Sequence, residues 1–257
     1  MILRDYHMHT TWCDGSASAE NMVKAAIAQG LEEIGFSGHS YTWFDESYCM
    51  MPEATIAYRS ELASLREKYS GRIRILIGTE QDRYSEAPTD AYDYFIGSVH
   101  YVKLGEEYVP VDETPEILRD AAKRYFDGDM MSLAEEYFRT AGEVAEKTGC
   151  SIIGHFDLIT KFNEDGSLFD TEDPRYIAAW KAAADRLLKA GVPFEINTGA
   201  MSKGYRSEPY PAKPIRDYIR SGGGHFILSS DSHRTDTLCY AFDRYEDEAD
   251  ITAPPAR

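Results

Sequence analysis

Short runs of β-branched and aromatic residues alternate along the 257-residue chain with longer segments whose apolar residues recur at helical spacing. The short runs predict strands at residues 2–6, 33–37, 73–77, 94–99, 151–153, 193–196 and 226–229. The longer segments predict helices at residues 18–29, 52–69, 114–126, 132–147, 174–190 and 212–220. Strands that alternate with helices are typical of parallel β/α units, and no linker or low-complexity tract divides the chain. We therefore predict an α/β barrel that forms a single domain over residues 1–257.

Polar side chains follow the predicted strands, at the end of a barrel where the active site is normally built. Nine of them could bind a metal ion, and each lies at or just beyond the carboxyl end of a strand: His7, His9, Asp14, His39, Glu80, His100, His155, Asp231 and His233. The seventh histidine, His225, precedes the last predicted strand. It should therefore lie at the opposite end of the barrel, where we expect a structural role.

The first motif, His7-Met-His9, and the last, Asp231-Ser-His233, have the same two-residue spacing. Residues two apart in an extended chain point to the same side, so each pair can approach one ion. Six imidazoles and three carboxylates on one rim would be costly to bury without cations, because desolvation and repulsion both oppose it. Nine ligands suit two or three ions, and mixed histidine and carboxylate ligation favours Zn, Fe or Mn. A single structural zinc is disfavoured, because such sites are usually rich in cysteine.

The net charge of −17 argues against a nucleic-acid partner, because a duplex binder needs a basic face. No apolar run approaches the ~18 residues of a membrane span, and we expect no signal peptide. The four cysteines are scattered without a C-x-x-C pair, which predicts reduced thiols in a cytoplasmic protein. The oligomeric state stays open.

The motifs resemble those of the PHP (polymerase and histidinol phosphatase) superfamily, in order and over essentially the whole chain. They are Asp5–Thr10, Asp14-Gly15, Ser37–Ser40, Gly78–Glu80, Gly97–His100, Gly154–Leu158, Glu195–Thr198 and Ser230–His233. Three of these motifs and some later segments resemble the histidinol-phosphatase branch in particular. The motifs are Gly97–His100, Gly154–Leu158 and Glu195–Thr198, and the later segments are Lys161-Phe162, Tyr205-Arg206 and Pro209–Pro211.

This resemblance implies a distorted (β/α)7 barrel of the PHP type with a trinuclear metal site at the carboxyl ends of the strands. The first ion would be held by His7, His9, Glu80 and Asp231. The second would share Glu80 and add His100 and His155. The third would be held by Asp14, His39 and His233.

The implied activity is hydrolysis of L-histidinol phosphate to histidinol and phosphate, in histidine biosynthesis, by attack of a metal-bound hydroxide. Lys161, Asn197 and Arg206 are candidates for phosphate or substrate contacts. Asp231 and His233 are candidates to carry a proton to the leaving group, and the choice of general acid stays open.

Three alternatives stay open at this point. The chain could hydrolyse another small phosphate ester, act as a PHP nuclease, or bind metal without catalysis. Its charge disfavours the nuclease, and an open site with so many ligands disfavours a purely structural role. A cysteine phosphatase built on Cys13 is disfavoured, because no phosphate-cradling loop with an arginine follows that residue.

Overall fold

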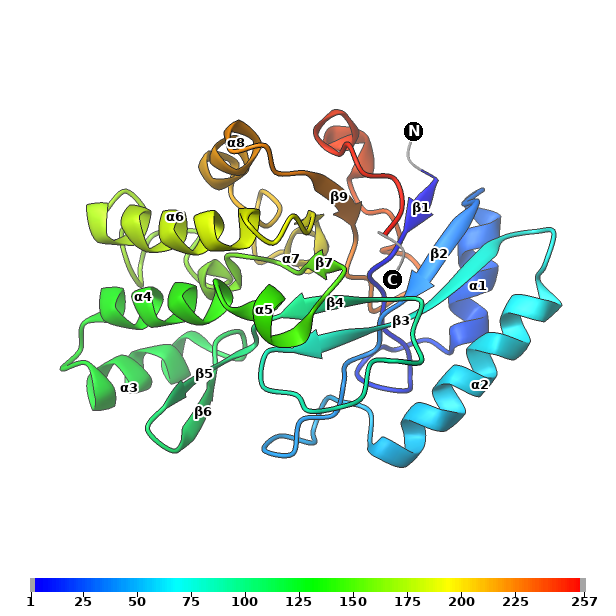
Figure 1. Cartoon of the computed structure of the whole chain (residues 1–257), viewed down its shortest axis with the longest axis horizontal. Coiled ribbons are helices and arrows are strands. Elements are labelled where there is room, and N and C mark those ends of the chain that lie inside the picture. The colour runs from blue at the N-terminus through cyan, green and yellow to red at the C-terminus, as the bar shows by residue number, and fades with distance from the viewer. Residues whose placement is uncertain (1–2, 255–257) are drawn as a thin grey trace.

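The computed structural model describes residues 3–254 and has at its centre a sheet of seven parallel strands (Figure 1). Across the sheet the order is β1 (Arg4–Asp5), β2 (Glu33–Phe36), β3 (Arg74–Asp82), β4 (Tyr94–Ser98), β7 (Ile152–Ile153), β8 (Phe194–Asn197) and β9 (Phe226–Ser229). Strands β2, β4, β8 and β9 are buried at every position, as expected when a parallel sheet is covered on both faces.

The first and last strands meet just beyond their carboxyl ends. Met8 and Ser232 form a parallel bridge there. The Asp5 carboxylate accepts hydrogen bonds from the backbone amides of Ser230 and Cys239, both at 3.1 Å. These contacts curl the sheet into a nearly closed barrel. The predicted distorted barrel of seven parallel strands is therefore confirmed.

Tyr94 is wholly buried in the interior of the barrel, in one cluster with Tyr6, Ile96, Ile152 and Ile227. Its hydroxyl lies 2.5 Å from the carbonyl oxygen of Tyr6 and 3.2 Å from that of Phe36. A Cβ atom at Gly35 or Gly78 would come within 2.4 or 2.5 Å of the tyrosine side chain, so only glycine leaves room at those positions. The interior of the barrel beneath the carboxyl ends of the strands is therefore closely packed.

Helices cover the outside of the barrel (Figure 1). They are α1 (Ala19–Ala28), α2 (Pro52–Lys68), α3 (Pro115–Tyr125), α4 (Met130–Ala141), α5 (Val144–Thr148), α6 (Pro174–Leu188) and α8 (Lys213–Ser221). The short helix α7 (Gly199–Ser202) lies instead at the carboxyl end, where Gly199 packs against Asp231. Three short 3-10 helices are η1 (Leu158–Thr160), η2 (Phe242–Arg244) and η3 (Glu246–Glu248). Ser18 caps α1 as predicted, because its hydroxyl accepts a hydrogen bond from the amide of Asn21. Proline occupies the first turn of α2, α3 and α6.

Several elements differ from their predictions. The helix predicted at 132–147 is divided into α4 and α5, with Gly142 as the C-terminal cap of α4. A Cβ at this glycine would lie 3.1 Å from the Cα of Ala183 in α6. Strand β3 continues past residue 77, since its first half pairs with β2 and its second half with β4. The hairpin of β5 (Tyr101–Leu104) and β6 (Glu107–Pro110) and the short helix α7 were not predicted. Ile2, at the start of the first predicted strand, lies outside the described residues.

The amino end of the barrel is covered by the last described segment of the chain. Ile251 bridges to Ile227, and the Tyr6 hydroxyl donates a hydrogen bond of 2.9 Å to the carbonyl of Thr252. His225 lies at this end, as predicted, with its side chain 60% exposed and Nδ1 2.7 Å from Asp250. Within residues 3–254, no helix combines the length and the apolar character that a membrane crossing requires.

Candidate metal centre

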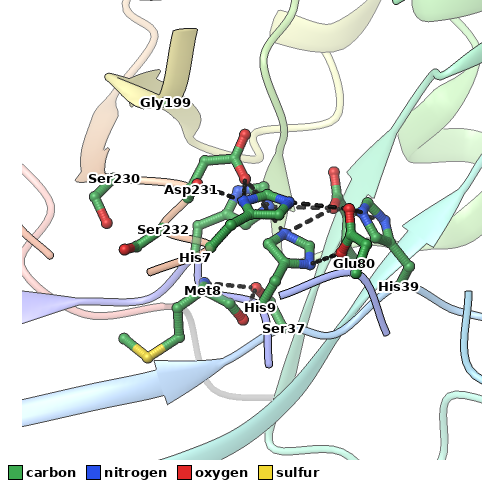
Figure 2. A network of polar contacts seen from close by, with 12 residues as sticks. His7, Met8, His9, Ser37, His39, Glu80, Gly199, Ser230, Asp231 and Ser232 are labelled. Atoms are coloured by element: carbon green, nitrogen blue, oxygen red, sulfur yellow. Dashed lines mark hydrogen bonds and ion pairs between the residues drawn. The ribbon is translucent and has the colours of Figure 1, made fainter. Parts of the chain in front are cut away.

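The two outer motifs of the chain lie side by side at the closing seam of the barrel. His7 and His9 follow β1, are wholly buried, and have their ring centroids 5.2 Å apart. Between them Met8 turns the other way, into an apolar cluster, and its amide donates to the Ser37 hydroxyl at 2.9 Å. Figure 2 shows both imidazoles directed toward Glu80, with Asp231 beside them. The extended backbone therefore puts both rings on one side, as the two-residue spacing predicts.

Glu80 lies at the centre of the cluster, on the second half of β3. Only 1% of the surface of Glu80 is exposed to solvent. Its two carboxylate oxygens lie 2.8–3.4 Å from ring nitrogens of five histidines, His7, His9, His39, His100 and His155. One carboxylate at this distance from five imidazoles is the arrangement expected of a ligand shared between ions.

Asp231 approaches the cluster from the loop after β9. Its Oδ1 lies 3.3 Å from His9 Nε2 and 3.7 Å from His7 Nε2. The residue has a φ of 49°, a left-handed conformation that is costly for a non-glycine side chain. Gly199 makes room for it, since a Cβ there would lie 2.7 Å from the Cβ of Asp231. The fold thus holds this carboxylate in a conformation it would not adopt freely.

His233 and Asp14 complete the outer part of the cluster. The Oδ2 atom of Asp14 lies 3.1 Å from His233 Nε2 and 3.6 Å from His39 Nε2. The ring of His233 stacks on that of His9, with centroids 4.2 Å apart. This part is more open, because the Asp14 side chain is 33% exposed.

All nine predicted side chains converge, and the donor atoms of seven of them form three adjoining groups, while His155 and Asp231 lie beside Glu80 and His9. In each group the atoms lie within 4.8 Å of one another; the groups are His9, Asp14, His39 and His233; His7, His9 and Glu80; and His39, Glu80 and His100. His9, His39 and Glu80 each belong to two groups. The geometry could therefore hold more than one ion at neighbouring positions.

The electrostatics of the cluster are those of a site that needs a cation. Burial and the nearby His233 and His39 lower the pKa of His9 to about 3, so this ring stays neutral. Burial alone would lower the pKa of His39, but the carboxylates of Asp14 and Glu80 raise it to about 9. Burial would raise the pKa of Glu80, yet the surrounding imidazoles hold it well below its usual range. Positive charge is thus drawn to the space between these groups.

Two buried ring nitrogens without hydrogen-bond partners show whether these residues fit a metal ion. His7 Nε2 and His9 Nε2 are fully buried and have no hydrogen-bond partner, although both lie close to Glu80. A buried polar atom without a partner is costly. Imidazole nitrogens and carboxylates are also the donor set that Zn, Fe and Mn accept. The residues present therefore fit a metal centre.

A cavity of about 240 Å³ opens above the cluster. Seven of the nine candidates line it, namely Asp14, His39, Glu80, His100, His155, Asp231 and His233. The cavity wall also carries Asp45, Tyr48, Tyr101 and Asp112 from the loop after β2 and from the region of the β5–β6 hairpin. Lys161 and Lys203 line the cavity from the segments after β7 and β8. A small molecule in the cavity could therefore reach the candidate metal ligands at its floor.

The three predicted substrate contacts have different positions. Lys161 follows η1 and lines the cavity, where its ammonium donates to the backbone carbonyl of Asp112 at 2.6 Å and lies 3.2 Å from the carboxylate of the same residue. It also lies 5.1 Å from the ring centroid of Tyr205. This cation is therefore held in place at the wall.

Asn197 and Arg206 are outside the lining of the cavity. The Asn197 amide donates to Glu195 at 3.1 Å and accepts from the amide of Gly199 at 2.9 Å. The Arg206 guanidinium donates to the Thr160 hydroxyl and lies 5.0 Å from the ring centroid of Tyr210. A direct substrate contact by either side chain would require it to leave these partners.

Contacts between the cluster and other buried residues of the site were not predicted from the sequence. Glu195 contacts His7, and Asp82 accepts hydrogen bonds from the backbone and the ring of His100 at 3.0 and 3.2 Å. A glutamate between two apolar residues of a buried strand was a signal for the first. Lys203 had no such signal, because its position depends on the unpredicted helix α7.

Comparison with known proteins agrees with this geometry. The sequence profile of the PHP domain matches residues 5–199. A probable histidinol-phosphatase of Schizosaccharomyces pombe is 28% identical over 240 residues, which cover 83% of this chain and 74% of that protein. Another of that name, from Deinococcus radiodurans, is 28% identical over 251 residues, covering 93% and 90% of the two chains.

A solved structure shares the fold. The histidinol phosphate phosphatase of Lactococcus lactis, complexed with zinc, L-histidinol and phosphate, superposes with a TM-score of 0.70 at 20% identity, covering 98% of this chain and 94% of that one. The PHP profile ends before Asp231 and His233, but the fold brings both residues to the site. Because the profile covers most of its length, this chain belongs to the PHP domain family.

Proposed function

We propose that the protein is a metal-dependent phosphomonoesterase that hydrolyses L-histidinol phosphate to histidinol and phosphate. The observation that carries the proposal is the Glu80 carboxylate, surrounded by five imidazoles at the floor of an open cavity. The names of the two relatives support the choice of substrate and a place in histidine biosynthesis.

The proposed centre holds two to three divalent ions, with Zn, Fe and Mn as the candidates. His7, His9, Glu80 and Asp231 would hold the first ion, Glu80, His100 and His155 the second, and Asp14, His39 and His233 the third. Such ions, when bound, lower the pKa of water and neutralise phosphoryl oxygens. Because Glu80 contacts imidazoles with both oxygens, it is the candidate to bridge ions.

The phosphate must reach a protein of net charge −17, so local cations have to attract it. Lys161 and Lys203 provide that charge at the cavity wall. Lys203 is exposed, and among residues 3–254 its ammonium group has no hydrogen bond or ion pair. We propose that Lys161, held by Asp112, orients the phosphoryl group and that Lys203 attracts it.

Acidic side chains on the wall suit the other end of this substrate. Asp45, Asp112 and Glu113 line the same cavity as the two lysines. A substrate with both a phosphate and an ammonium group would match this mixed lining. Asp231 or His233, at the rim of the cluster, would return a proton to the departing alkoxide.

We also propose that the protein acts as a single-domain barrel in the cytoplasm. Its four cysteines, Cys13, Cys49, Cys150 and Cys239, are all free thiols. Free thiols suit a reducing compartment.

A panel of substrates tests the proposal. Protein loaded with Zn²⁺, Mn²⁺ or Fe²⁺ is assayed against histidinol phosphate, other small phosphomonoesters and a single-stranded oligonucleotide. We expect release of phosphate from histidinol phosphate at the highest kcat/KM of the panel. A preference for another ester would contradict the substrate, and cleavage of the oligonucleotide alone would indicate a nuclease.

A further inference from the structure

Glu195 is a charged side chain in the interior of the barrel. It lies on β8 between Phe194 and Ile196 and is 1% exposed. Its Oε1 atom lies 2.6 Å from His7 Nδ1 and accepts from the Ser229 hydroxyl at 2.8 Å. Its Oε2 atom accepts from the backbone amide of His155 at 3.0 Å and from the Asn197 amide at 3.1 Å. A carboxylate offers about four acceptor sites, so all of its capacity is used.

The contact with His7 determines how that ring can bind a metal. Because an ionised carboxylate only accepts hydrogen bonds, Nδ1 of His7 must carry a proton. In a neutral ring the other nitrogen, Nε2, then has a free lone pair. That atom is the one that lacks a hydrogen-bond partner and lies 3.2 Å from Glu80. The carboxylate thus selects the tautomer that binds metal.

The contact with His155 acts through the backbone. Holding the amide of His155 fixes the chain where it leaves β7. The ring of this residue extends from the fixed backbone and brings Nε2 to 2.8 Å from Glu80 Oε1. One carboxylate therefore supports candidate ligands that come from two different strands of the barrel.

From these contacts we propose that Glu195 is a positioning residue of the metal centre, which sets the tautomer of His7 and the direction of His155. This inference rests on the metal-binding part of the proposed function. It does not depend on which phosphate ester is the substrate.

The first test uses the full chain stripped of metal and titrated with Zn²⁺ alone, in competition with a chromogenic chelator. We expect Glu195→Gln to bind zinc about 10- to 100-fold more weakly, the usual effect of losing a carboxylate that orients a metal ligand. The side-chain NH2 group of glutamine cannot accept a hydrogen bond. It would therefore replace an acceptor either at His7 or at the donors of His155 and Asn197. Activity should recover in excess zinc. Unchanged zinc affinity in a folded variant would overturn the proposal.

Ser229→Ala is the matched control, because it removes one hydrogen bond of the same carboxylate and touches no histidine. We expect its zinc affinity to stay within about threefold of wild type, well short of the effect of losing a carboxylate that orients a metal ligand. An equal loss in both variants would overturn the proposal, because any change in the barrel interior would then have the same effect.

A measurement on the wild-type protein covers the case in which Glu195→Gln does not fold. Nitrogen NMR of the zinc-loaded chain reports which nitrogen of His7 carries the proton. We expect the proton on Nδ1, and a proton on Nε2 would overturn the proposal. Because these readouts need no phosphate ester, a negative substrate panel would refute the phosphatase without affecting this inference.

Discussion

The two ends of the barrel bury different chemistry. At the carboxyl end, six histidines share three carboxylates within one cluster. At the amino end, Tyr6, Tyr94 and Ile227 form an apolar plug, against which Ile251 packs. The barrel is thus sealed by side chains at one end and left open over polar groups at the other.

The histidines show what this difference means. His225, at the amino end, is exposed and has one carboxylate partner, Asp250. Each histidine of the cluster faces a carboxylate that it shares with other rings, as around Glu80. The presence of a histidine alone therefore says little about metal binding. Its position on the barrel determines whether it can be a ligand.

The largest effect should come from the centre of the cluster. Glu80→Gln removes the charge that five imidazoles face, so we expect phosphatase activity to fall by several orders of magnitude. The fold should survive, because the side chain keeps its volume. Steady-state kinetics, with circular dichroism as the check on folding, measures both. Near-normal turnover would show that the centre is built around another residue.

The cavity wall should matter less than the floor. Lys161→Ala removes a fixed cation beside the proposed phosphate site, so we expect kcat/KM for histidinol phosphate to fall by about tenfold to a thousandfold. Metal content, measured in parallel by elemental analysis, should not change. Wild-type kcat/KM in this variant would mean that the phosphate is held without Lys161.

Removing the metal should destabilise the carboxyl end. An ion at 100 times its Kd stabilises the folded state by about 2.7 kcal/mol. For a chain of this size that corresponds to a rise in Tm of about 5–10 °C. Thermal unfolding with Zn²⁺ and with a chelator should show this difference in the wild type and in His225→Asn, and Glu80→Gln should lose most of it. Identical melting with and without Zn²⁺ would contradict a metal centre at this site.

Arg206 separates a structural role from a substrate contact. Its guanidinium is buried between Thr160 and Tyr210, so we expect Arg206→Ala to lower the free energy of unfolding by about 1–3 kcal/mol. Urea denaturation measures this change. A stable variant with weakened histidinol phosphate turnover would restore the direct contact predicted from the sequence.

The smallest effect is expected at the amino end. His225→Asn removes an exposed contact with Asp250, so activity should stay within a few-fold of wild type. Zinc content should be unchanged. A loss of metal in this variant would show that the two ends of the barrel are coupled.

Most of the barrel and the floor of the site could be predicted because both follow from local patterns. Strands that end in polar residues place those residues on one rim whatever the loops do, so Glu80 and His155 were found from position alone. The walls depend on distant packing instead. Lys203 reaches the cavity through α7, a helix of four residues that is too short to show a periodic pattern, so its position was not predictable from local sequence.

The seam between β1 and β9 has a consequence for the order in which the chain assembles during synthesis. Asp5 and Ser230, which join across it, are 225 residues apart. At about 5–20 residues per second, a ribosome needs roughly 10–45 s to make the second after the first. Each inner strand can pair with its predecessor as soon as it is made, because sheet neighbours are successive strands of the barrel. His7 and His9 are made before the other members of the cluster, yet they gain their partner Asp231 only after β9 has been made.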